Sequence, residues 1–88
     1  MKKLEAVVID KIGFHARPAS KVVNVASKFH SKIEITKADG TVGNLKSVIN
    51  IMSLAIRHGE KIKITAEGED EAAAIKQIEK VLIDEKLI

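Results

Sequence analysis

A histidine and an arginine two positions apart, His15 and Arg17, are the residues of this sequence best suited to group-transfer chemistry. Imidazole is a good nucleophile near neutral pH, and a phosphorylated imidazole passes its phosphoryl group on readily. A guanidinium adds a planar, permanently charged donor for phosphate oxygens. Pro18 follows directly, and proline is favoured in the first turn of a helix. The sequence therefore predicts both side chains at a helix start, although a residue before proline tends to avoid helical geometry.

The start of a helix suits an anion. Its first backbone N–H groups have no partner within the helix, and the positive end of the helix dipole points outward. A phosphate placed there would be stabilised by both, and Gly13 keeps the approach open. A single histidine between a strand and a helix is, however, more often a solvated or capping side chain. The neighbouring residues must therefore decide whether His15 is such a side chain or a reactive one.

The elements that would position these residues follow from the hydrophobic pattern. A β-rich composition predicts a strand at residues 4–9, and strict alternation predicts strands at 32–37 and 61–66. Asp39-Gly40 is a hairpin signal that predicts a further strand at 41–43. Helical spacing begins at Pro18 and again after Asp70, which we expect to cap the last helix. The two apolar stripes are Ala19, Val22, Val23, Ala26 and Phe29, then Ala74, Ile75, Ile78, Val81 and Leu82. With one more helix, the order is β-α-β-β-α-β-α, an α+β fold with helices on one face of an antiparallel sheet.

That additional helix, within residues 47–56, would be apolar on nearly every side, which exceeds what one core face can bury. One side carries Leu45, Val48, Ile49 and Met52, and another carries Ile51, Leu54 and Ala55. Either the helix is wholly buried, or one side covers the sheet while the other faces a partner. The pattern leaves both alternatives open.

Composition narrows the classes of function. The 88 residues suffice for one domain, residues 1–88. The absence of cysteine excludes disulfides and thiolate metal sites and is typical of a reducing compartment. No apolar run approaches the roughly 18 residues of a membrane span, so we expect a cytoplasmic protein without membrane insertion. The net charge of +3 is mild and aromatic residues make up only 2%, which disfavours nucleic acid as a partner. No cofactor or metal is expected.

Two segments carry a resemblance to a known family. The stretch from Gly13 to Ser20, Gly-Phe-His-Ala-Arg-Pro-Ala-Ser, closely resembles the active-site signature of HPr, the histidine-containing phosphocarrier of the bacterial phosphoenolpyruvate:sugar phosphotransferase system. Asn44-Leu45-Lys46-Ser47, followed by Met52-Ser53-Leu54, is similar to the second signature of the Gram-positive type. The resemblance spans the whole chain. It implies an open-faced β-sandwich, four antiparallel strands covered on one face by three helices, and a phosphoryl carrier rather than an enzyme.

The resemblance also implies roles for individual residues. His15 would accept a phosphoryl group from phosphorylated enzyme I, as a pros-phosphohistidine, and donate it to enzyme IIA components of sugar permeases. Arg17 would pair with the phosphate, and the helix-start amides near Ala16 and Arg17 would cradle it. Such transfer needs no internal base or metal, because docking aligns the donor and acceptor histidines. The protein would work as a monomer. Partner docking is expected at Ser20, Val48, Ile49 and Met52.

Ser47 matches the serine that an HPr kinase/phosphorylase modifies in Gram-positive relatives, which couples carbon status to transcription through the catabolite control protein. A phosphate there would suit the helix dipole but repel acidic partners. The alternative is an ordinary serine that caps a helix. Gly43 makes the preceding turn one residue longer than in common relatives, an insertion that a loop tolerates. His30 and His58 match no family function and are expected on the surface.

Three other functions remain to be weighed. A regulatory relative of HPr would lack the active histidine, whereas His15 is present. A small RNA-binding α+β domain would carry aromatics on its strands, and this chain has no Tyr or Trp. A hydrolase would use His15 as a general base, but no carboxylate or nucleophile has a recognisable pairing with it in the sequence.

Overall fold

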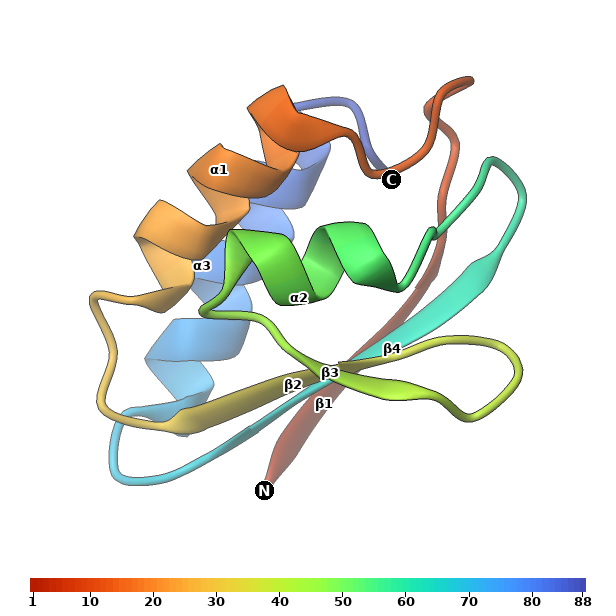
Figure 1. Ribbon diagram of the computed structural model, residues 1–88. Coiled ribbons are helices and arrows are strands. Elements are labelled where there is room, and N and C mark those ends of the chain that lie inside the picture. The colour runs from red at the N-terminus through yellow and green to blue at the C-terminus, as the bar shows by residue number, and fades with distance from the viewer.

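The computed structural model describes residues 1–88 and places seven elements along the chain (Figure 1). They are β1 (Lys2–Val7), α1 (Ala16–Ala26), β2 (Lys32–Thr36), β3 (Val42–Asn44), α2 (Val48–Ser53), β4 (Lys61–Glu67) and α3 (Glu71–Asp84). The predicted order β-α-β-β-α-β-α is therefore confirmed. None of the helices has the length and hydropathy of a membrane-spanning segment.

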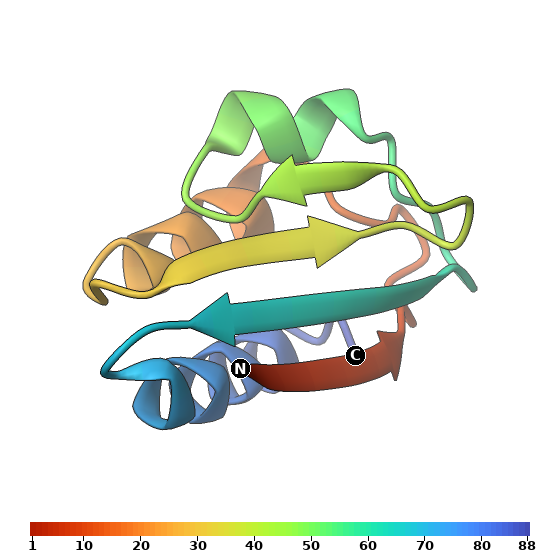
Figure 2. The same cartoon turned by 90° about the horizontal axis from the view of Figure 1, so that it is seen from below.

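The four strands form one antiparallel sheet in the order β1-β4-β2-β3. Ile64 of β4 lies between Leu4 of β1 and Ile35 of β2, and Ile35 pairs on its other side with Gly43 of β3. All three helices cover the same face of this sheet, and Figure 2 shows the opposite face uncovered. The α+β architecture expected from the pattern, with its open face, is the observed one.

The core is aliphatic and lies between the sheet and the helices. Period-two alternation turns one side of each strand inward, while the three- and four-residue spacing of the helices gives each an apolar stripe. The fully or almost fully buried members are Ile33, Ile35, Ile62, Ile64 and Ala66 from the strands, and Ala19, Val22, Ala26, Ile51, Ala74, Ile78 and Leu82 from the helices.

Several predicted boundaries were wrong. β1 begins and ends two residues before the predicted 4–9. The amide of Val8 still donates in register to the Glu60 carbonyl (3.0 Å), but the amide of Ile9 donates to the carbonyl of Leu87 (2.8 Å) and so leaves the sheet. α1 begins at Ala16 rather than Pro18, and it ends at Ala26. Phe29 therefore lies beyond the helix, partly buried against the core.

The conformation of α2 decides between the two alternatives for residues 47–56. Ile51 is fully buried, whereas Ile49 is 84% exposed and Met52 38% exposed. The wholly buried alternative is wrong, since one side of α2 seals the core and the other faces outward. The predicted grouping of side chains was also wrong at two positions: Leu45 is fully buried, and Ala55 is exposed with a φ of 52°.

Gly43 does not lie in a lengthened turn, as the sequence led us to expect. It is a buried residue of β3 that pairs with Ile35 in regular register. A Cβ atom at this position would lie 2.7 Å from Cδ1 of Leu54 and 3.0 Å from Oδ1 of Asn50. The missing side chain therefore lets α2 approach β3 closely.

Asp70 occupies the N-cap position of α3, but its side chain does not cap that helix. The carboxylate instead accepts hydrogen bonds from the hydroxyl of Ser31 and from the backbone N–H groups of His30 (2.8 Å) and Ser31 (3.0 Å). These bonds, that of the Ser31 hydroxyl foremost, lower the pKa of Asp70 to about 2. Asp70 thus ties the start of α3 to the segment before β2.

Candidate functional site

His15 is the N-cap residue of α1. Its backbone is extended (φ −101°, ψ 175°), and its carbonyl accepts the first intrahelical bond, from the amide of Ala19 at 3.1 Å. Its side chain makes no capping hydrogen bond and is 37% exposed. The imidazole therefore does not cap the helix, which excludes a capping role. It is open to solvent, as either a solvated or a reactive side chain would be.

The helix start beside His15 has free donors. The amides of Ala16 and Arg17 donate to no acceptor within the protein, and Pro18 has no amide to donate. No acidic side chain occupies the first turn, while Arg17 is exposed there. Two unpartnered N–H groups thus lie at the positive end of an 11-residue helix, and Arg17 in the same turn carries a guanidinium. Such an arrangement stabilises an anion.

The loop before His15 rests on the segment that follows α2. Gly13 has a φ of 85°, a conformation that favours glycine. The next amide, that of Phe14, donates to the carbonyl of Ile56 (3.2 Å), and the Phe14 side chain is buried. A Cβ on Gly13 would collide with this same carbonyl oxygen and lie 3.0 Å from Cα of Arg57. Gly13 therefore permits the close contact that fixes the position of His15 at the N-cap of α1.

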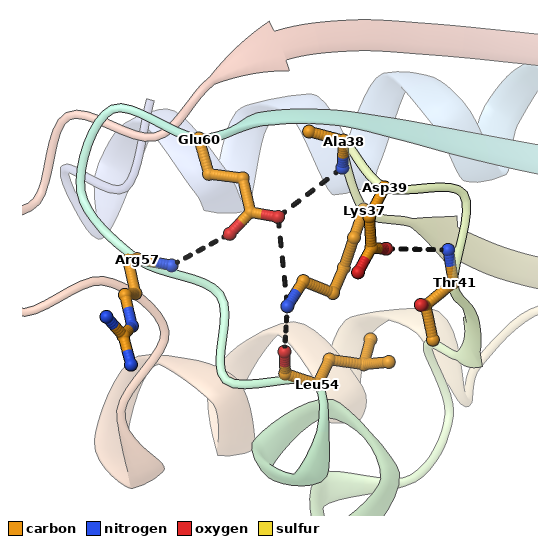
Figure 3. Close-up of polar contacts among 7 residues, drawn as sticks. All are labelled: Lys37, Ala38, Asp39, Thr41, Leu54, Arg57 and Glu60. Atoms are coloured by element: carbon orange, nitrogen blue, oxygen red, sulfur yellow. Dashed lines mark hydrogen bonds and ion pairs between the residues drawn. The ribbon is translucent and has the colours of Figure 1, made fainter.

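The segment under this loop, residues 54–60, is itself held by two partly buried charges (Figure 3). Nζ of Lys37 donates to the carbonyl of Leu54 (2.6 Å), at the end of α2, and lies 3.9 Å from the carboxylate of Glu60. The Glu60 carboxylate also accepts the amides of Arg57 (3.2 Å) and Ala38 (3.4 Å). We call this set of contacts the Lys37–Glu60 clasp. It joins the β2–β3 hairpin, the end of α2 and the segment on which the His15 loop rests.

One residue of the site was missed by the sequence analysis, which found no carboxylate paired with His15. Oδ2 of Asp10 lies 3.9 Å from Nε2 of His15, and Oδ1 accepts the amide of Ile12 at 2.8 Å. The amide of Gly13 donates to the Asp10 carbonyl (3.1 Å), which folds the chain back. An aspartate two to three residues before a glycine is a turn signal, so the pattern was visible, although its contact with His15 was not.

The outer side of α2 provides an exposed apolar surface. Ile49 and Met52 are exposed and Val48 is half-buried, while Ser20 is exposed on the neighbouring α1. The structure thus leaves accessible the side chains expected to dock partners. Figure 1 shows α2 crossing beside α1, and the Phe14 to Ile56 bond puts the His15 loop at the C-terminal end of α2.

Ser47 lies at the other end of this helix. It is the N-cap of α2, and its Oγ accepts the amide of Asn50 at 3.2 Å, as the ordinary capping alternative expects. A helix of six residues is about 9 Å long, so Ser47 and the His15 loop flank α2 from opposite ends. The side chain is half-buried.

His30 and His58 are exposed, as expected. No three His, Cys, Asp or Glu side chains come together as metal ligands would.

Comparison with known proteins finds one family along almost the whole chain. Residues 2–84 match the PTS-HPr family model, described as the PTS HPr component phosphorylation site. The phosphocarrier protein HPr of Mycoplasma genitalium is 48% identical over 88 residues, which cover 100% of both chains. A Mycoplasma histidine-containing phosphocarrier protein of known structure is 46% identical, with a TM-score of 0.96 and coverage of 99% and 98%. An HPr dimer from Thermoanaerobacter tengcongensis is 44% identical, with a TM-score of 0.74 and coverage of 98% and 97%.

Proposed function

Because this chain belongs to the HPr family, the phosphocarrier component of the phosphotransferase system and not an enzyme, we propose that His15 carries the phosphoryl group as a pros-phosphohistidine. The observation that carries the proposal is the position of His15 directly before two free amides, those of Ala16 and Arg17. Three phosphoryl oxygens need donors, which these amides and the Arg17 guanidinium supply. The exposed ring allows a donor histidine to approach in line.

Incubation with enzyme I and phosphoenolpyruvate tests this assignment. We expect one acid-labile phosphoryl group per chain, absent from His15→Ala. The variant His30→Ala is a matched control, because it removes an exposed imidazole whose backbone is bound by Asp70 at the start of α3; it should be labelled like the parent chain. Labelling that survives in His15→Ala would refute the assignment.

The donor in this proposal is phosphorylated enzyme I, and the acceptors are enzyme IIA components of sugar permeases. The outer side of α2, with Val48, Ile49 and Met52, and Ser20 on α1 would form the docking surface. An exposed apolar patch beside a basic site suits partners that combine apolar and acidic side chains. Ile49→Asp should weaken binding of both partners more than Ile83→Asp, because Ile83 is similarly apolar and 53% exposed but lies on α3. Equal losses would rule out this surface.

For Ser47, the proposal is regulatory phosphorylation by HPr kinase/phosphorylase, with the catabolite control protein as reader. A phosphate at this N-cap would meet the positive end of α2 and keep the fold, while its charge would repel acidic partners from the docking surface. The expected product is an acid-stable phosphate formed with ATP and lost in Ser47→Ala. Ser53, an exposed serine of the same helix, supplies the control variant Ser53→Ala. Label retained in Ser47→Ala would refute the site.

We further propose that residues 1–88 act as one domain, in the cytoplasm, and that the monomer is the transferring unit. All the residues assigned to transfer lie within one chain, on the side of the sheet that the helices cover. Light scattering at working concentration tests the oligomeric state, since a dimer is described for the HPr of Thermoanaerobacter tengcongensis. Transfer that disappears on dilution below the dissociation constant of a dimer would contradict the monomer.

A further inference from the structure

The carboxylate of Asp10 faces one ring nitrogen of His15 and leaves the other free. Its Oδ2 is 3.9 Å from Nε2, an ion-pair distance that can shorten when a partner docks. Its Oδ1 accepts the amide of Ile12 at 2.8 Å, so the loop orients the carboxylate. Asp10 is only 22% exposed, and its contact is with Nε2 of His15, whose side chain makes no capping hydrogen bond to the helix.

We propose that Asp10 is a positioning residue that holds the proton of the His15 ring on Nε2, so that Nδ1 presents its lone pair to the phosphoryl donor. A neutral imidazole has one N–H and one lone pair, and an ionised carboxylate can only accept a hydrogen bond. A carboxylate facing Nε2 therefore favours the tautomer in which Nε2 is protonated. This role rests on the proposed function of His15 as the carrier.

The transfer step then balances without a base or metal. The Nδ1 lone pair forms a bond to phosphorus while the bond between phosphorus and the nitrogen of the donor histidine breaks. The proton stays on Nε2 throughout, so the ring of phosphorylated His15 carries a positive charge that the Asp10 carboxylate offsets. Donation to the acceptor reverses these bond changes and returns His15 to the same tautomer.

The variant Asp10→Asn removes the charge but keeps an oxygen that can accept the Ile12 amide, so the turn should survive. Asp39→Asn is its matched control, because Asp39 makes the same type of contact in the β2–β3 hairpin, with the amide of Thr41 at 2.9 Å. Nitrogen-15 spectra of the His15 ring report the tautomer without any phosphodonor. Enzyme I-dependent phosphorylation reports the rate, and the NMR spectrum of the product reports which nitrogen is modified.

In Asp10→Asn we expect a larger share of the ring to be protonated on Nδ1. The maximal rate of phosphorylation should be two- to fivefold lower, about the effect of a partly exposed ion pair, and KM should be unchanged. Asp39→Asn should match the parent chain in both respects. A ring spectrum and rate equal to those of Asp39→Asn would overturn the proposal, and so would a changed spectrum with an unchanged rate. If Asp10→Asn does not fold, Asp10→Ser also keeps a turn acceptor without the charge. A parent chain that is never phosphorylated would refute the carrier function, yet the ring spectra would still test the Asp10 contact.

Discussion

Replacement of Gly13 by alanine should uncouple the His15 loop from the segment beneath it. Two costs add at this position. A residue with a side chain pays about 1–2 kcal/mol to adopt the left-handed conformation that Gly13 has, with a φ of 85°. The new Cβ would also collide with the Ile56 carbonyl, which is backbone and cannot rotate away, and such overpacking costs a further ~1–3 kcal/mol. The free energy of unfolding should therefore fall by about 2–5 kcal/mol.

Two other glycines separate these costs. Gly40 and Gly59 have φ values of 92° and 84°, but a Cβ on either would meet no atom within 4 Å. In Gly40→Ala and Gly59→Ala, the free energy of unfolding measured in urea should fall only by the conformational term, about 1–2 kcal/mol. The free energy of unfolding of Gly13→Ala should fall further. At temperatures where this variant remains folded, it should accept phosphate more slowly, because the hydrogen bond from Phe14 to Ile56 that positions His15 is displaced. Equal destabilisation of all three variants, with a normal rate in Gly13→Ala, would refute the role of this contact.

Three further outcomes are expected from the same structure. Ala55→Gly should raise the free energy of unfolding by about 1 kcal/mol, because Ala55 directly follows the C-cap of α2 and has a φ of 52°. An unchanged urea midpoint would contradict this. Lys37→Met should lower the free energy of unfolding by about 1–3 kcal/mol, because the Lys37–Glu60 clasp is lost. Lys61→Met should have little effect, because it breaks an ion pair whose side chains, Lys61 and Glu5, are 67% and 45% exposed. Because the pKa of Asp70 is lowered from 3.8 to about 2, its stabilising contribution is complete above pH 3.8 and lost as the pH falls through about 2. Acid titration of unfolding should show this loss in the parent chain and a smaller one in Ser31→Ala.

The sequence by itself determined the elements and the candidate nucleophile. Period-two and helical spacing are local properties, so the strands, the two long helices and their order could be predicted to within a few residues. The proximity of His15, Arg17 and Pro18 was likewise readable, because neighbours along the chain share one helix start. The resemblance to HPr rested on the same contiguous residues.

Only the tertiary structure decided what depends on contacts between distant segments. The side of α2 that is buried follows from its packing on β3, where Gly43 admits Leu54, and no pattern within α2 distinguishes that side. The clasp between Lys37 and Glu60 joins a hairpin to a loop that no local signal connects. Asp10 and His15 meet because the turn at Gly13 folds one onto the other, and the direction of a side chain in such a turn depends on backbone angles that a list of residue types does not specify.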